Sequence, residues 1–495
     1  MPFWGVAADP RQCRKLGLVG SATLATGGLA SGALPVGPPR AHADLGLFLA
    51  CFGMVLLVAA WLQLGQAIRS GRAPSPRWLL HTLGWWAAPL VLGPPLFSRD
   101  VYSYLAQGAL VDGGIDVYTH GPAALGGPLA LQVPGVWQQT PAPYGPVFLA
   151  LSGITERLVG TGVHAGVLGL RLVALVGIGL LAVLLPRLAR VCGADPAAAL
   201  WLGALNPLLL FHLVAGAHND AVLLALLVAG LVAARRRHPA WAAVLVTLAA
   251  LVKAPAALGL PVVVLLWYDQ LTGRHRLVRA ALATGAVALL TTVTVTAVIG
   301  TGYGWISALT VPVSAESWSL TSAIGRATAA VLEPYRPALA QSAVTAWRWL
   351  GLAAAATSVA YLAARVRRRE LGVVYALGLG LAAVVAFGPA IRPWYALWGV
   401  VLIAAAAPDG RVRRWAPAVS GLLAVAVVPD GFTPNREELV IALAGGAIAL
   451  ALLCCLRLGT GRWPGRLVPG RPVPGTAAAG PTSSDQVADS AEHLW

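Results

Sequence analysis

The sequence predicts an all-α polytopic membrane protein, and its composition and apolar patterning support this class. Of its 495 residues, 58% are hydrophobic and only 11% are charged, whereas a soluble domain carries about 25% charged residues. Apolar runs near the ~20 residues that cross a bilayer recur from end to end. Spanning segments must be helices or barrel strands, and these runs lack the two-residue alternation of membrane strands.

About fourteen of these runs are predicted to span the membrane. The stretch 98–144 is less hydrophobic, and together with a juxtamembrane helix at 145–160 it is expected to form a large first outer loop, 98–160. A second outer loop is expected at 301–341. The predicted spans are a first run ending near residue 36 and the runs 45–68, 78–97, 164–186, 197–213, 220–234, 239–252, 255–269, 277–300, 342–364, 371–388, 394–408, 415–429 and 436–457.

The formal net charge of +16 comes largely from arginines clustered between apolar runs. That pattern marks the cytosolic loops of membrane proteins, so it favours a role in orientation over nucleic-acid binding. If 145–160 does not span, the clusters all fall on one side and both chain ends are cytosolic. The clusters are Arg187 and Arg190, Arg235 to Arg237, Arg274 to Arg279, Arg365 to Arg369, and Arg411 to Arg414.

One transmembrane domain, residues 1–457, is expected to precede a disordered cytosolic tail, 458–495, rich in proline, glycine, alanine and serine. The N-terminus has the character of a basic flank before a first helix rather than a cleavable signal peptide. Five cysteines occur without CxxC or His/Cys ligand spacing. The pattern indicates neither a metal site nor a disulfide framework.

Polar residues at the predicted outer ends of helices are the candidates for chemistry, because ionisable residues in or beside membrane helices are usually functional. Asp100 stands where the third run leaves the membrane and has the character of a general base. A helix-end cap or an ion pair with Arg99 is the alternative. His218, Asn219 and Asp220 open a later run, where capping is again the alternative.

Three further segments carry candidate binding residues. Lys253 precedes the helix-breaking Pro255 and suits a phosphate, unless it extends to the lipid headgroups. The run from Arg392 through Trp394 and Tyr395 suits a sugar phosphate, with an interfacial aromatic belt as the alternative. The weaker candidates are Tyr144 in a proline-rich turn and, in a loop suited to a lid or simply solvated, Arg326 with Glu316 and Trp318.

At these residues the sequence resembles the actinobacterial polyprenol-phosphate-mannose-dependent α-1,6-mannosyltransferases of lipomannan and lipoarabinomannan assembly. Two positions depart from the family pattern: Asp116 replaces an expected Asn-Pro, and Arg392 replaces a neutral amide. The first leaves the acceptor preference open, and the second bears on contacts with the donor phosphate. The matching stretches are Ser98 to Gly108, Thr140 to Pro146, Asn206-Pro207, Gly216 to Asp220, Lys253 to Leu258 and Arg392 to Gly399.

The resemblance implies the multi-helix C-type glycosyltransferase fold in a multi-pass plasma-membrane protein with its active site on the outer face. It implies a polyprenyl phosphate mannose donor, a lipid-linked mannan acceptor and α-1,6 products, and it places the catalytic aspartate at Asp100. The hypothesis is an inverting transfer without a cofactor, although the sequence leaves a role for a divalent cation open. The residues expected to bind substrate are Arg99, Tyr102, Tyr144, His218, Asn219, Asp220, Lys253, Arg326, Arg392, Trp394 and Tyr395.

Two alternatives stay open at this point. One is a transferase for another polyprenyl-phosphate sugar such as arabinose. The other is a flippase or transporter of a lipid-linked sugar, which needs the same apolar helices and sparse polar residues. Transporters usually carry helix breaks in matched positions of two repeats. This chain shows one clear break, at Lys253-Ala254-Pro255, without a matched partner in its sequence. The missing partner and the large outer loop both favour an enzyme.

Overall fold

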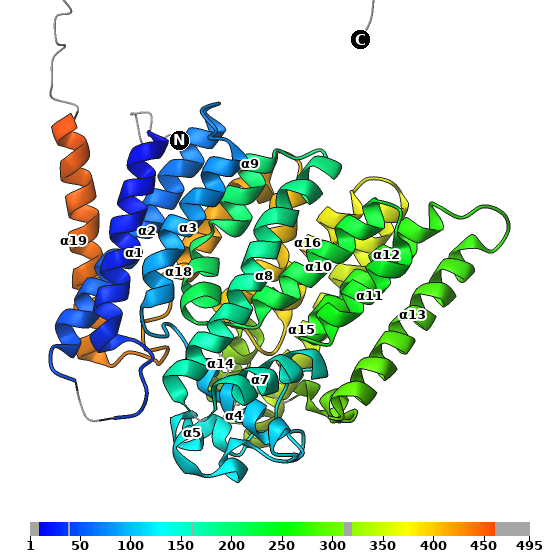
Figure 1. The fold of residues 1–495 in the computed structure, drawn as a ribbon, viewed down its shortest axis with the longest axis horizontal. Helices are drawn as coiled ribbons and strands as arrows, with labels where there is room; N and C mark the ends of the chain where they lie inside the picture. The colour runs from blue at the N-terminus through cyan, green and yellow to red at the C-terminus, as the bar shows by residue number, and fades with distance from the viewer. Residues whose placement is uncertain (1–8, 38–39, 161, 311–318, 461–495) are drawn as a thin grey trace, which may run out of the picture. The chain divides into compact units, whose positions relative to one another are not determined.

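A computed structural model describes residues 9–37, 40–160, 162–310 and 319–460 (Figure 1). Within these ranges the regular structure is helical without strands, which confirms the all-α class. The α-helices are α1 (Pro10–Ser31), α2 (Ala43–Arg69), α3 (Pro76–Leu92), α4 (Asp100–Asp112), α5 (Gly127–Gln132), α6 (Gly135–Gln138), α7 (Pro146–Val159), α8 (Val163–Val191), α9 (Pro196–Ala199), α10 (Asp220–Arg235), α11 (Pro239–Ala250), α12 (Gly259–Tyr268), α13 (Arg276–Ile299), α14 (Leu320–Leu332), α15 (Pro337–Arg367), α16 (Val373–Phe387), α17 (Ala396–Ala406), α18 (Arg411–Ala424) and α19 (Arg436–Thr460). The shorter turns are the 3-10 helices η1 (Pro122–Leu125), η4 (Ala254–Leu258), η5 (Gly304–Thr310) and η6 (Pro393–Tyr395) and the π-helical turns η2 (Leu200–Ala204) and η3 (Leu209–Ala215).

Five helices of the described chain are long and apolar enough to cross a membrane: α2, α8, α13, α15 and α19. A sixth span is possible if the bent pair formed by residues 196–204 and 209–215 counts as one. Other predicted runs form shorter apolar helices of 10–17 residues, so the predicted count of about fourteen spans is not confirmed. Together these helices identify the chain as an all-α membrane protein.

The predicted first outer loop is largely helical. It contains α4, the short α5 and α6, and α7, whose bounds match the juxtamembrane helix expected at 145–160. In Figure 1, α4, α5 and α7 gather at the lower end of the view, away from α9. The segment that carries Asp100 is therefore an ordered part of the fold.

The segment predicted as the second outer loop, 301–341, is also helical over part of its length, because α14 and the beginning of α15 lie within it. The Ser319 hydroxyl caps α14 by accepting a hydrogen bond from the backbone N–H of Ser322, a signal that the sequence analysis overlooked. Of the residues suited to a lid, Glu316 and Trp318 lie outside the described residues. So does most of the predicted tail, residues 461–495.

The predicted span at 197–213 is broken in its middle. Its two halves are bent by 60° at residues 205–208, because Pro207 has no backbone N–H to continue the helix. The Asn206 amide nitrogen donates to the Leu202 carbonyl at 2.9 Å and to the Ser420 hydroxyl at 3.0 Å. Both halves contain π-helical turns, which are rare and frequent at functional sites.

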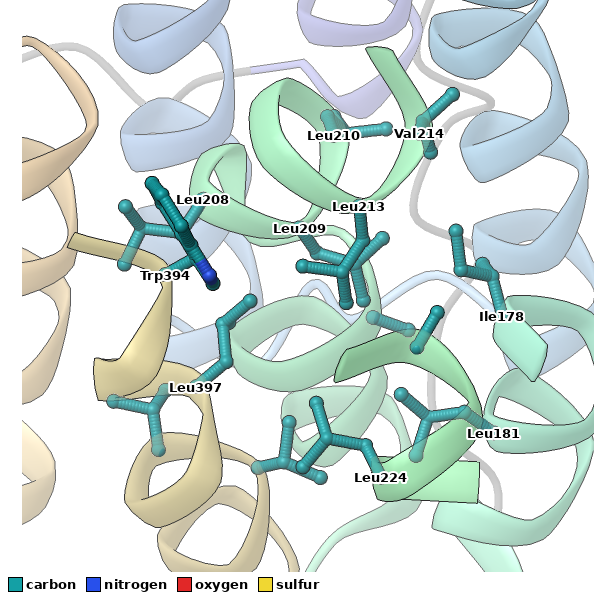
Figure 2. Packing of buried hydrophobic residues seen from close by; sticks show 14 of the residues in the cluster. Ile178, Leu181, Leu208, Leu209, Leu210, Leu213, Val214, Leu224, Trp394 and Leu397 are labelled. Carbon is teal, nitrogen blue, oxygen red and sulfur yellow. The ribbon is translucent and has the colours of Figure 1, made fainter. Parts of the chain in front are cut away.

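The bent segment lies in the middle of the apolar core. Figure 2 shows Leu209 and Leu213 between Leu397 of α17 on one side and Ile178 of α8 on the other. Trp394 of η6 lies beside Leu208 in the same view, and all of these residues are at most 4% exposed. Interlocked apolar packing of this kind holds η3 and η6 in one relative position.

Candidate active site

Four helix starts meet at one place, although they lie far apart in the sequence. Asp100 begins α4, Asp220 begins α10, Lys253 precedes η4, and Trp394 belongs to η6. An Asp100 carboxylate oxygen lies 3.9 Å from Nδ1 of His218, and the His218 ring stacks on Trp394 with centroids 3.9 Å apart. The structure therefore brings together segments that the sequence analysis singled out one by one.

Strained backbone leads into two of these segments. Phe97 and Ala217 adopt left-handed conformations, with φ of 65° and 53°. For a residue with a Cβ this costs on the order of 1–2 kcal/mol, and such strain tends to collect at functional sites. The two left-handed residues turn the chain just before the stretches that carry Asp100 and His218.

The buried Arg171 of α8 links the segments that lead to Asp100 and His218 by hydrogen bonds. Its guanidinium donates to the carbonyl oxygens of Val91 at 2.7 Å and Gly93 at 2.8 Å, at the C-terminal end of α3, and to that of Ala215 at 2.9 Å, at the end of η3. Helix C-termini leave such carbonyls without partners, and a cation there is favourable. Arg171 is 3% exposed, and its hydrogen bonds position the backbone that leads to Asp100 and His218.

The first half of the site centres on Asp100 and His218. The Tyr104 hydroxyl, one turn after Asp100 on α4, lies 2.9 Å from His218 Nδ1. His218 is fully buried, whereas the Asp100 side chain keeps 24% of its surface exposed, so a ligand can reach this carboxylate. Burial raises the pKa of Asp100 from its usual value of 3.8, while the positive charges of Arg392 and Lys253 oppose this rise.

The second half of the site is a buried ion pair. The Lys253 ammonium donates to both carboxylate oxygens of Asp220, at 3.2 and 3.0 Å. The indole N–H of Trp398 donates to one of the same oxygens at 2.6 Å, and the Tyr395 ring lies 4.4 Å from the ammonium. Since the side chains are 11% and 0% exposed, each charge depends on the other for its solvation.

The proline-rich turn around Tyr144 packs against this pair. The Gly145 N–H donates to the Val252 carbonyl at 3.4 Å, and a Cβ on Gly145 would collide with the carbonyl oxygen of Leu251. Glycine is needed at this close approach of two backbones. The turn holds the Tyr144 ring 5.9 Å from the Lys253 ammonium and edge-on to Tyr104, with centroids 5.2 Å apart.

Four predicted site residues lie apart from these contacts. Arg99 is not an ion-pair partner of Asp100; it donates to the carbonyl oxygens of Leu34 and Gln132. The Tyr102 hydroxyl donates to the Ala33 carbonyl, so both side chains stabilise the entry to α4. Asn219 is buried beside His218, and none of the described residues forms a hydrogen bond with its amide. Arg326 is exposed on α14, and the contacts described above do not include it.

The sequence analysis missed three residues of the cluster. Tyr104 lies four positions after Asp100, and Trp398 lies three after Tyr395, so helical spacing was the available signal. His212 in η3 has a ring centroid 4.9 Å from that of Trp394, and an ionisable residue inside an apolar run was its signal. Across the described ranges, no three His, Cys, Asp or Glu side chains are grouped so that they could hold a metal ion.

Known protein families include matches to this chain. The family model described as "Alpha-(1->6)-mannopyranosyltransferase, N-terminal domain" matches residues 14–269, which include Asp100, His218, Asp220 and Lys253. The chain belongs to this family. A second model, "MptB C-terminal domain", matches residues 321–457, which include Arg392 and Trp394.

Relatives within this α-(1→6)-mannopyranosyltransferase family align with most of the chain. It is 36% identical to "Alpha-(1->6)-mannopyranosyltransferase A" of Mycobacterium tuberculosis, over 84% of each chain. It is 33% identical to a "Probable alpha-(1->6)-mannopyranosyltransferase" of Mycolicibacterium smegmatis, over 90% of this chain and 88% of the relative. No solved structure shows a significant match. The resemblance inferred from the motifs is thus confirmed, and the chain is a mannosyltransferase of the membrane.

Proposed function

We propose that the protein transfers mannose from a polyprenyl phosphate mannose to a lipid-linked mannan acceptor on the outer face of the plasma membrane. The product is an α-1,6 linkage formed with inversion at the anomeric carbon of a β-linked donor. The observation that carries this proposal is the position of Asp100. It is a reachable carboxylate in a mannosyltransferase, surrounded by buried aromatic rings and by the charges of Lys253 and Arg392.

In this mechanism the oxygen of the acceptor 6-hydroxyl attacks the anomeric carbon from the face opposite the phosphate. The carbon–oxygen bond to the phosphate breaks, its electron pair leaves with the phosphate oxygen, and the hydroxyl proton passes to Asp100. Inverting transfer needs one base on the attacking side. The Tyr104 hydroxyl and Nδ1 of His218 lie 2.9 Å apart, and the two side chains form the wall of the site beside that base.

The leaving phosphate needs positive charge rather than a general acid, because it departs as a stable anion. The sequence analysis gave this role to Lys253 and Arg392, with Arg326 as a weaker candidate. Since the charge of Lys253 is balanced by Asp220 at 3.0 Å, Arg392 is the better phosphate partner of the two. Arg392 is half-buried, and its positive charge opposes the rise in the pKa of Asp100, which supports this assignment.

The proposed reaction is tested with purified full-length protein, synthetic polyprenyl phosphate sugars and a short α-mannoside acceptor. We expect turnover with the mannose donor, far slower turnover with the arabinose donor, and a 1,6 linkage in the isolated product. Equal turnover of the arabinose donor would overturn the assignment of the sugar. No turnover, with scrambling of lipid-linked sugar in vesicles, would identify a flippase instead.

The outer-face placement has its own test. In a variant whose five native cysteines are replaced by alanine, single cysteines are introduced in the first loop at exposed Gly114 and in the cytosolic cluster at exposed Arg368. Intact cells are then treated with a membrane-impermeant thiol reagent. We expect labelling at position 114 without permeabilisation and at position 368 only after it. The reverse pattern would place the site on the cytosolic side.

Arg392→Gln is expected to raise the donor KM by roughly tenfold to more than a hundredfold, with a smaller effect on the acceptor KM. The reason is the loss of a charge-assisted contact with the phosphate, worth about 1.5–3 kcal/mol. The measurement is initial-rate kinetics with each substrate varied in turn. The matched control is Arg157→Gln on α7, where a side chain 73% exposed pairs with Asp112. An unchanged donor KM in Arg392→Gln would place the phosphate elsewhere.

A further inference from the structure

An apolar groove of about 450 Å³ lies among α12, α13 and α15. Leu260, Val264 and Leu265 line it from one face of α12, and the small residues Ala281 and Gly285 line it from α13. The membrane-spanning portions of α13 and α15 are only 11% buried. The groove is therefore bounded by helices that present most of their surface to the bilayer.

One end of the groove is charged. Its lining from α15 consists of Ala363 and, one turn later, Arg367. Arg368 and Arg369 follow at once, while the nearby Glu370 already pairs with Arg365. An arginine at the end of an otherwise apolar groove complements a ligand with an apolar chain and an anionic head, and basic pockets between membrane helices bind anionic lipid headgroups.

The charged end lies far from the catalytic cluster. Leu265 follows Lys253 by 12 residues along η4 and α12, a helical path of about 18 Å. On the other side, α16 has 15 residues, or roughly 22 Å, and separates the segment after Arg367 from the one that carries Arg392. A donor whose phosphate lies at Arg392 cannot also place that phosphate at Arg367.

We propose that this groove binds an anionic phospholipid of the bilayer, with its phosphate on Arg367 and an acyl chain between α12 and α13. The site is separate from the proposed transfer reaction and does not depend on it. Its lipid fills the space that α12 and α13 leave open beside the end of α15. Gly285 borders open space, because a Cβ built on it meets no atom within 4 Å, and the glycine leaves that space to the acyl chain.

The test is native mass spectrometry of the full-length protein in detergent, titrated with phosphatidylglycerol or phosphatidylcholine. For the wild type we expect one tight phosphatidylglycerol site and at least tenfold weaker phosphatidylcholine binding. Arg367→Gln is expected to weaken phosphatidylglycerol binding by roughly tenfold or more, the usual effect of losing a charge-assisted contact. Gly285→Leu places a side chain in the groove and should displace the lipid in the same assay.

Two variants on α8 serve as matched controls. Arg190→Gln removes an exposed arginine, and Gly179→Leu adds a side chain where a Cβ likewise meets no atom within 4 Å. Both should bind phosphatidylglycerol as the wild type does. The proposal is overturned if Arg367→Gln and Gly285→Leu also bind like the wild type, or if phosphatidylcholine binds equally well. It is also overturned if Gly285→Leu raises only the donor KM, since the groove would then hold the donor's polyprenyl chain.

Discussion

Replacing Asp100 with asparagine is expected to lower turnover roughly 100- to 10,000-fold while membrane insertion and donor binding stay intact. Asparagine keeps the size of the side chain but cannot take the proton of the acceptor hydroxyl, and general-base catalysis contributes about that factor. The measurement is kcat with both substrates saturating, together with donor binding and thermal stability of the same preparation.

The alternative roles of Asp100 give different results in this experiment. Asparagine caps helices nearly as well as aspartate, so a capping role would leave kcat close to that of the wild type.

Burial raises the pKa of Asp100, and this rise is partly opposed by the charges of Arg392 and Lys253. Wild-type activity should therefore fall on acidification at a pH above the usual carboxyl range. Asp100→Asn should lose that acidic limb, because the titrating group is gone. A kcat close to that of the wild type in Asp100→Asn would show that Asp100 is not the general base.

Breaking the Lys253–Asp220 pair is expected to destabilise the protein by about 3–5 kcal/mol for Asp220→Asn or for Lys253→Met alone. Each single change leaves one buried charge without its partner, since the two side chains are 0% and 11% exposed. The double variant should be much more stable than the sum of the single losses predicts. The free energy of unfolding in detergent micelles, measured over this double-mutant cycle, provides the check.

The chain offers an exposed ion pair as the control for that cycle. Arg157 and Asp112 lie 2.6 Å apart with exposures of 73% and 34%, and a pair of this kind contributes about 0.2–1 kcal/mol. If the Lys253–Asp220 cycle gave an equally small coupling, Lys253 would not depend on Asp220. If Asp220→Asn also lowered the donor KM at unchanged stability, the ammonium would be free to bind phosphate, as the sequence analysis first proposed.

The candidate site was predictable in pieces because its segments share a local signal. Each carries a polar residue at the end of an apolar run, as Asp100 and His218 do, or beside a proline that breaks a helix, as Lys253 does. Such positions stand out in a membrane protein, where a polar residue is costly unless it is used. The helix at 320–332 was missed because, although apolar, it has only 13 residues, too few to span a bilayer, and the serine that caps it was overlooked.

The sequence by itself determined the all-α membrane class and the mannosyltransferase family, since hydropathy and motif order are properties of neighbouring residues along the chain. Only the tertiary structure decided which charges are free. Asp220 meets Lys253 across 33 positions and Trp398 across 178, and Arg99 turns away from the adjacent Asp100 to donate to Leu34, 65 positions earlier. Whether a buried charge is paired depends on contacts between distant helices, which follow from how the helices pack and leave no periodic pattern in the sequence.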